Sequence, residues 1–140
     1  MYENKKFGTA INCIDGRAQS PVADWLKLNY QLDYVDMITV PGADKILAEG
    51  SSAKTERISR RVELSANAHA SGVVAIAGHY DCAANPVTFE EHKKQIGLAV
   101  QLVESWKLGL RVIGIYVNEW NSVDLITDTG SEEGKLRSFL

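Results

Sequence analysis

The sequence predicts an α/β protein in which a mostly parallel β-sheet is flanked by helices. Two short apolar runs, one starting at Phe7 and one at Val73, indicate strands buried on both faces, as strands of parallel sheets usually are. Helix-like segments alternate with the strands, which favours right-handed crossovers between parallel strands. The 140 residues are 45% hydrophobic and 24% charged, so we expect a single domain over 1–140.

Residues at the end of the first strand and at the start of the following helix indicate where these two elements lie. The strand runs from Phe7 to Cys13 and presents a thiol where it ends. Ser20-Pro21 has the form of an N-cap residue followed by proline at the first helical position. Apolar residues at helical spacing then predict a short amphipathic helix whose inner face carries Val22, Trp25, Leu26 and Tyr30.

A second strand and a longer helix follow. Residues 34–40 are rich in β-branched side chains and are stopped by Pro41-Gly42, which predicts a strand. Apolar spacing predicts the helix over about 52–70, and Gly72 provides its stop. The segment 43–50 between them is ambiguous and could hold a helical turn.

The second half of the chain continues the alternation. The apolar run at 73–77 predicts the third strand. Residues 88–91 have the spacing of a capping box and open a helix that we expect to run to about Lys107. Residues 110–117 predict a fourth strand and 122–127 a fifth, joined to it in what could be a hairpin.

The strand ends that carry reactive side chains fix the expected strand order. Cys13 follows the first strand and His79 the third, so these strands should be neighbours and the sheet should have the order 2-1-3-4, with the fifth strand at the edge. The gap between their carboxyl ends is then the place where such sheets bind ligands. The apolar C-terminal residues Leu136, Phe139 and Leu140 could pack on the body or on a partner.

Five polar side chains gather at these two strand ends. Cys13, Asp15 and Arg17 occupy alternate positions, so in extended backbone they project to one side. A turn after the third strand can aim both His79 and Cys82 at one point. Two thiolates and an imidazole suit zinc and leave the fourth position open, as in catalytic zinc sites. Asp15, held by Arg17, would accept a hydrogen bond from the zinc-bound water; released, it could become the fourth ligand.

The same residues have plainer interpretations. Free cysteines in a cytosolic domain are often small buried hydrophobes. Asp15-Gly16-Arg17 could be a turn with a local ion pair. Cys13 and Cys82 could also form a redox pair, which predicts a disulfide and no metal.

Two motifs resemble those of the β-class carbonic anhydrases. Cys13-Ile14-Asp15-Gly16-Arg17 is similar to their Cys-x-Asp-x-Arg motif, and His79-Tyr80-Asp81-Cys82 is similar to their His-x-x-Cys motif. Residues 36–40 resemble the second strand of the family, and 114–116 resemble its terminal hairpin. The resemblance extends over most of the chain, roughly 6–127.

This resemblance implies a zinc enzyme, a carbonic-anhydrase-like lyase. A zinc hydroxide would add to carbon dioxide to give bicarbonate. Cys13, His79 and Cys82 would be the Zn2+ ligands, and Asp15 with Arg17 would orient the nucleophile. The resemblance also implies a homodimer or a higher homo-oligomer, whose interface helps to form the active-site cleft.

The sequence departs from the family at two points near the site. Pro41-Gly42-Ala43-Asp44 stands where the family commonly has Arg-Asn-Ala-Gly, and Ala83 replaces the glycine that commonly follows the second cysteine. Two alternatives therefore stand beside carbonic anhydrase activity. One is a zinc hydrolase of another small linear substrate, such as a carbon–sulfur compound. The other is a zinc-binding homologue without catalysis.

Other candidate residues receive separate interpretations. His69 is expected to be a packed or partly exposed helix residue, since nothing pairs with it at metal spacing. His92 lies among charged residues and is expected to be solvated. Asp44 and Lys45 follow the second strand and could reach the crevice. Asp81 is expected to be a loop residue or to contact the site from outside the ligand set.

Composition narrows the function classes. The 15 basic and 18 acidic residues give a formal charge of -3 and form no basic stripe, so nucleic acid is not an expected partner. No apolar run approaches the roughly 18 residues of a membrane span, so we expect no membrane partner and a cytoplasmic location.

Overall fold

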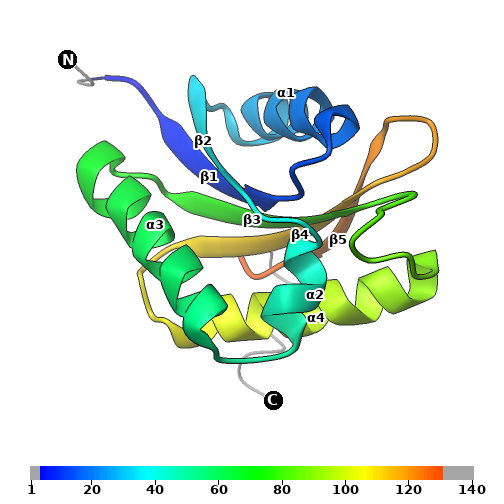
Figure 1. The fold of residues 1–140 in the computed structure, drawn as a ribbon. Helices are drawn as coiled ribbons and strands as arrows, with labels where there is room; N and C mark the ends of the chain where they lie inside the picture. The colour runs from blue at the N-terminus through cyan, green and yellow to red at the C-terminus, as the bar shows by residue number, and fades with distance from the viewer. Residues whose placement is uncertain (1–3, 131–140) are drawn as a thin grey trace.

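The computed structural model describes residues 4–130, which fold around a five-stranded sheet (Figure 1). Its strands are β1 (Phe7–Asn12), β2 (Tyr34–Thr39), β3 (Val73–His79), β4 (Arg111–Val117) and β5 (Val123–Asp128). Their order in the sheet is β2-β1-β3-β4-β5. All neighbours pair in parallel except β4 and β5, which form an antiparallel hairpin. The predicted order is confirmed; the expected packing of Leu136, Phe139 and Leu140 lies outside the described residues.

Helices cover both faces of the sheet. One face carries α1 (Gln19–Tyr30), and the other carries α2 (Ala43–Ala48), α3 (Ala53–His69) and α4 (Phe89–Ser105), as Figure 1 shows. The ambiguous segment 43–50 therefore holds a short helix. The last helix ends two residues before the expected Lys107, which has a left-handed backbone with φ 53°.

The prediction that Ser20 caps α1 is wrong. A short 3-10 turn, η1 (Gly16–Ala18), runs directly into the helix, so that Gln19 is the first helical residue. Gln19 donates a side-chain hydrogen bond back to the carbonyl oxygen of Cys13 at 2.6 Å. Pro21 is accommodated because the N–H groups of the first helical turn have no partner within the helix. The helix start is thereby tied to the end of β1.

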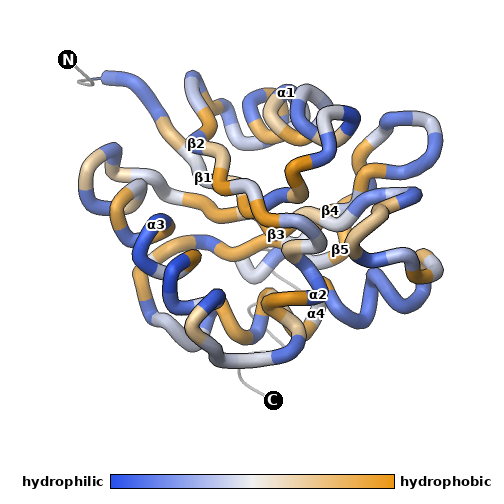
Figure 2. The backbone as a smooth tube through the Cα atoms, in the orientation of Figure 1, coloured by the Kyte–Doolittle hydropathy of each residue, from blue (hydrophilic) through white to orange (hydrophobic). Residues whose placement is uncertain are grey.

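The sheet divides the apolar interior into two layers. Both β1 and β3 are buried along their whole length, as their sequences predict, and successive side chains point to opposite faces. The layer under α1 contains Ala10, Val22, Leu26, Ala75 and Ile113. The layer under the other helices contains Ile11, Ile38, Ile58, Val62, Ile76 and Ile96. Figure 2 shows the hydrophobic strands between helices whose outer turns are hydrophilic.

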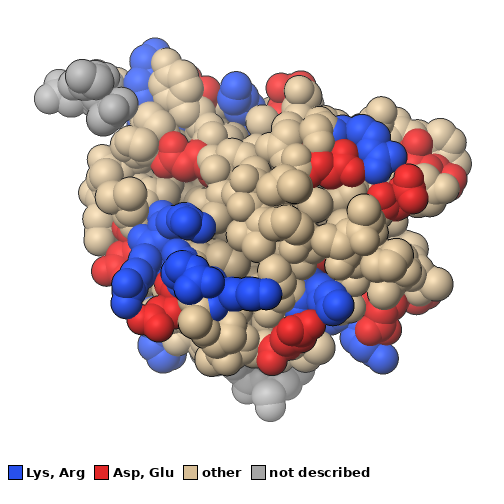
Figure 3. Space-filling view, viewed as in Figure 1, with Lys and Arg blue, Asp and Glu red and all other residues tan. Residues whose placement is uncertain are grey.

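Charged side chains cover the outer surface unevenly. On the face shown in Figure 3, basic side chains gather over α3, and acidic and basic side chains are interspersed elsewhere. Lys54, Arg57 and Arg61 together line a hollow of about 370 Å³ beside the end of β2. Among the helices within residues 4–130, none is long and apolar enough to cross a membrane.

Candidate metal centre

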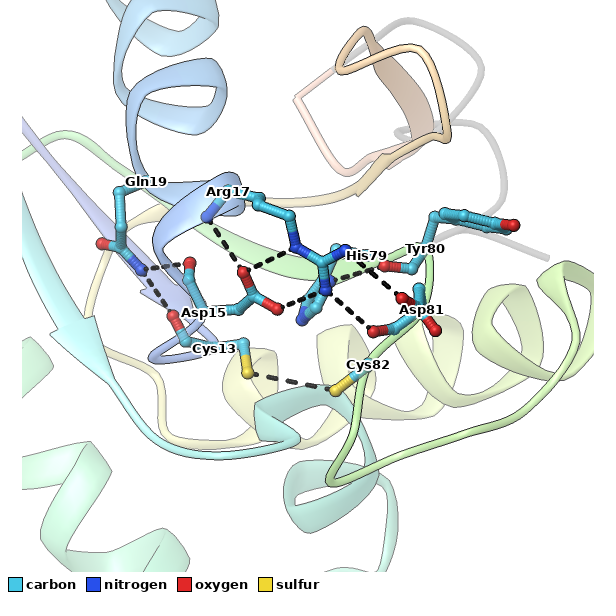
Figure 4. Close-up of polar contacts among 8 residues, drawn as sticks. All are labelled: Cys13, Asp15, Arg17, Gln19, His79, Tyr80, Asp81 and Cys82. Atoms are coloured by element: carbon cyan, nitrogen blue, oxygen red, sulfur yellow. Dashed lines mark hydrogen bonds and ion pairs between the residues drawn. The ribbon is translucent and has the colours of Figure 1, made fainter.

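Three donor side chains meet where β1 and β3 end side by side (Figure 4). Cys13 follows β1, His79 is the last residue of β3, and Cys82 lies in the loop after it. One ligand atom from each residue lies within 4.8 Å of the other two, and the sulfurs are 3.9 Å apart. Two sulfurs bound tetrahedrally at about 2.3 Å from one zinc ion would be about 3.8 Å apart. The observed separation therefore suits zinc.

The imidazole of His79 is prepared to donate a lone pair. Its Nδ1 lies 2.9 Å from the carbonyl oxygen of Tyr80, and because a carbonyl only accepts, Nδ1 carries the proton. Its Nε2 is buried without a hydrogen-bond partner, a condition that only His92 shares among the described residues. An unpaired buried nitrogen is unfavourable, and a metal ion bound at Nε2 would remove that cost.

The two thiols are buried and free. Cys13 is 5% exposed and Cys82 is 3% exposed, and no disulfide joins them, contrary to the redox interpretation. Burial, together with the neighbouring Cys13, raises the pKa of Cys82 to about 11. A metal ion must therefore displace the Cys82 proton at neutral pH, because the thiolate is the ligand.

Asp15 is held by Arg17 in a bidentate arrangement. Nε and Nη2 of Arg17 donate to the two carboxylate oxygens of Asp15 at 3.1 and 2.7 Å, and the backbone N–H of Arg17 donates at 2.9 Å. These hydrogen bonds hold the pKa of Asp15 well below its usual range. Since both oxygens face Arg17, Asp15 stands beside the Cys13, His79 and Cys82 cluster and is not a member of it.

Arg17 also ties the two strand ends to each other. Its Nη1 lies 3.3 Å from Oδ2 of Asp81, and its Nη2 donates to the backbone carbonyl of Asp81 at 3.1 Å. Asp81 was expected either to be a plain loop residue or to contact the site from outside the ligand set. In the structure it contacts the site, through Arg17. The loop after β1 and the loop after β3 are thus fastened directly over the donor cluster, as Figure 4 shows.

A hollow of about 560 Å³ reaches Cys82 from the side of the β4–β5 hairpin. Its walls are mainly aromatic and acidic, and they include Tyr80, Asp81, Phe89, Tyr116, Glu119 and Trp120. Apart from Asp81, the sequence pattern did not indicate these lining residues, because they come from β4, the start of α4 and separate loops. The hollow gives a small molecule a route to the donor cluster.

The prediction that His92 is solvated is wrong. Its side chain is 1% exposed, and its Nδ1 lies 2.6 Å from Oδ2 of Asp44, which is 2% exposed. The charged neighbours of His92 face solvent, whereas His92 shares the inner helical face with Ile96 and Ala99. His92 lies four residues before Ile96 and seven before Ala99, and this helical spacing could have predicted that His92 is buried. Asp44 lies in the interior as well, while Lys45 is exposed.

His69 fulfils its predicted role as a partly exposed helix residue. Its ring stacks on Phe7 with 4.2 Å between centroids, and its Nδ1 lies 2.6 Å from Oδ2 of Asp36. This pair lies against the edge strand β2. It takes no part in the donor cluster.

Fold and site together define a class: an α/β protein with a cysteine–histidine–cysteine donor set at the switch point of its parallel strands. The model of a family described as "Putative carbonic anhydrase" matches residues 3–127, which is most of the chain. The chain therefore belongs to the carbonic anhydrase family of the β class, and its strand order is that of the family fold. No curated protein matches this chain significantly in sequence.

Solved structures with the same fold include three carbonic anhydrases. The β-carbonic anhydrase isoform I of Trichomonas vaginalis is 15% identical, with a TM-score of 0.60 over 86% of this chain and 82% of that one. The enzyme of Streptococcus mutans is 14% identical, with a TM-score of 0.60 over 85% and 81%. That of Glaciozyma antarctica is 15% identical, with a TM-score of 0.56 over 85% and 81%. At these identities the likeness shows the fold.

Proposed function

We propose that this protein is a zinc-dependent carbonic anhydrase, which converts carbon dioxide and water reversibly to bicarbonate. The observation that carries the proposal is the buried cluster of Cys13, His79 and Cys82 beside the paired Asp15 and Arg17, in a chain of this family. Two sulfurs and one imidazole nitrogen favour zinc over the harder cations magnesium and calcium, which prefer oxygen.

Each ligand has a distinct contribution to metal binding. Cys13 and Cys82 would bind as thiolates, whose negative charges offset the charge of the ion. His79 would bind through Nε2, since Nδ1 already donates to the backbone. When bound, zinc supplies Lewis acidity that lowers the pKa of a coordinated water to about 7.

Asp15 would position the attacking water. Because its pKa lies well below the usual range, its carboxylate stays ionised at neutral pH and can only accept hydrogen bonds. It would accept the O–H of the water and so orient the oxygen lone pair toward carbon dioxide. Arg17 fixes the carboxylate in turn, and this arrangement supports the orienting role of Asp15 over that of a fourth ligand.

The decisive experiment measures zinc and turnover on the same preparation. We expect about one zinc ion per chain, loss of zinc in Cys82→Ser, and carbon dioxide hydration above the buffer rate in stopped flow at pH 7 or 9. Wild-type protein without zinc would refute the metal site. Zinc without hydration at either pH would identify a binding homologue that lacks catalysis.

A second candidate is a zinc hydrolase of another small linear substrate, such as a carbon–sulfur compound. The hollow beside Cys82 favours it, since about 560 Å³ far exceeds the roughly 30 Å³ of one water and can admit larger molecules than carbon dioxide. Release of hydrogen sulfide from carbon disulfide, measured beside carbon dioxide hydration, decides between the two substrates.

We also propose that the protein is a homo-oligomer in the cytoplasm. Free thiols suit a reducing compartment. The aromatic side chains of Tyr80, Phe89 and Trp120 are 51%, 40% and 76% exposed around the hollow, and a second copy of the chain would cover them. Light scattering on the purified protein tests the oligomer, and a monomer at micromolar concentration would refute it.

A further inference from the structure

A buried polar network lies behind the metal centre and consists of Asp44, Asn85, His92 and Gln95. Asp44 is 2% exposed, and Asn85 and His92 are each 1% exposed. Oδ2 of Asp44 lies 2.6 Å from Nδ1 of His92, and Oδ1 accepts a hydrogen bond from Nδ2 of Asn85 at 3.0 Å. Nδ2 of Asn85 also donates to Oε1 of Gln95 at 2.7 Å. The ligand set of the proposed function does not account for this network.

The network contacts the back of the strand that ends in His79. A Cβ atom built on Gly78 would lie 2.6 Å from Oδ2 of Asp44 and 3.2 Å from Nδ1 of His92. Glycine at position 78 is therefore what lets the Asp44 carboxylate reach the strand. The network packs against Gly78, and the next residue in β3 is the candidate ligand His79.

Asn85 joins the network to Cys82. Its backbone N–H donates to the carbonyl oxygen of Cys82 at 3.2 Å, which closes the turn 82–85. This hydrogen bond ties the Asn85 backbone to the backbone of the candidate ligand, three residues earlier. Gly42 closes over the same turn, because a Cβ there would lie 3.2 Å from the carbonyl oxygen of Ala84.

We propose that Asn85 is a positioning residue for the Cys82 sulfur. The buried network holds the Asn85 side chain and with it the turn 82–85, so that the Cys82 sulfur lies 3.9 Å from the sulfur of Cys13. A residue that fixes the loop of a metal ligand also fixes the direction of that ligand, as supporting residues do in metal sites generally. This inference rests on the proposed zinc site.

The network also gives a physical account of one departure from the family motif. Asp44 stands where a glycine is common, and a glycine has no side chain with which to accept from Asn85 or His92. In this chain the altered loop after β2 therefore supports the turn that carries Cys82. The Asp44 side chain is buried and does not line the hollow beside Cys82.

The test replaces Asn85 by alanine, which removes the anchor and keeps the backbone N–H. Zinc affinity is measured by competition with a chelator, and the thiolate-to-cobalt charge-transfer absorption is recorded after loading the metal-free protein with Co2+. We expect zinc to bind about 10- to 100-fold more weakly than in wild type, with a displaced or weakened charge-transfer band.

Ser65→Ala is the matched control. Ser65 is 5% exposed, and its hydroxyl is bonded to Thr9, Asp36 and Ser71 at 2.6 to 2.7 Å, in the layer between β1 and α3. Its loss should lower stability and leave both the zinc affinity and the cobalt spectrum unchanged. An Asn85→Ala protein that matches Ser65→Ala in both metal readouts would overturn the inference.

A second variant covers the case in which Asn85→Ala does not fold. Gln95→Met removes only the outer hydrogen bond of Asn85, at a half-buried position on α4. It should weaken zinc binding in the same direction by a few-fold, and an unchanged cobalt spectrum and zinc affinity would overturn the inference. Wild-type protein that binds neither metal refutes the proposed function itself, which is a different result from a failure of Asn85 alone.

Discussion

Two aspartate–histidine pairs with the same separation occupy very different surroundings in this protein. Asp44 and His92 are joined at 2.6 Å with side chains 2% and 1% exposed. Asp36 and His69 are also joined at 2.6 Å, but their side chains are 29% and 25% exposed. The first pair lies behind the metal centre and the second at the edge strand β2. Distance alone therefore does not fix what such a pair contributes, because water can replace partners only at the second pair.

The buried carboxylate of Asp44 is also surrounded by fixed hydrogen-bond donors. Asp44 accepts hydrogen bonds from the backbone of Lys45 and the side chain of Asn85, both at 3.0 Å, in addition to its contact with His92. These three donors take the place of water around the buried carboxylate. Removing Asp44 would leave them unpaired in the interior, where water does not reach.

The largest expected effect separates the two pairs directly. Asp44→Ala should lower the free energy of unfolding by about 3 to 5 kcal/mol, since it strands buried donors. Asp36→Ala, the matched change at the exposed pair, should cost about 1 to 2 kcal/mol. Urea unfolding of both variants measures the difference. Equal losses would show that burial does not distinguish the pairs.

An intermediate effect is expected at the glycine against which the buried pair packs. Gly78→Ala would place a Cβ atom 2.6 Å from Asp44 and should destabilise the fold by about 1 to 3 kcal/mol, through overpacking. Gly97→Ala is its control, because a Cβ at this helical position meets nothing within 4 Å. The control should raise stability by up to about 1 kcal/mol, as alanine favours helix over glycine.

Thermal unfolding of the two glycine variants gives the signs of both changes. Opposite signs support a tight contact between Asp44 and β3. A Gly78→Ala protein as stable as wild type would show that the buried network has room to move, and would weaken the argument that it positions the metal centre.

The smallest expected effect on stability concerns Asp15. Its carboxylate is held by an exposed arginine, whereas the carboxylates of the two pairs above are held by histidines. Because the folded-state pKa lies well below the usual 3.8, the stabilising contribution of Asp15 is fully present above about pH 4 and is lost as the pH falls through the folded-state pKa. Arg17→Ala should raise the pKa of Asp15 toward 3.8 and remove this acid-side dependence. A carboxyl-carbon NMR titration measures the change.

Arg57→Ala provides the control for Asp15, since it removes another exposed positive charge, which lies beside β2. It should leave the Asp15 titration unchanged. Should Arg57→Ala shift the Asp15 pKa as far as Arg17→Ala does, the general charge of the protein, and not the bidentate hydrogen bonds, would be the cause.

Local patterns were sufficient for the fold and for predicting that the three candidate donor residues lie together. Buried apolar runs at β1 and β3 and the thiol after β1 implied neighbouring strands, and the sheet has that order. The sequence-based prediction was wrong for His92. Its charged neighbours indicated a solvated helix face, although its spacing from Ile96 is that of a buried face. The prediction for Ser20 was wrong because the turn η1 starts the helix early.

The sequence by itself determined the alternation of strands and helices and the donor types at the two strand ends, because periodicity and turn residues act over a few positions. Only the tertiary structure decided which polar groups support those ends. Asn85 and His92 reach Asp44 across 41 and 48 residues, and Arg17 reaches Asp81 across 64. Such hydrogen bonds depend on how whole elements pack, and no local pattern specifies that packing.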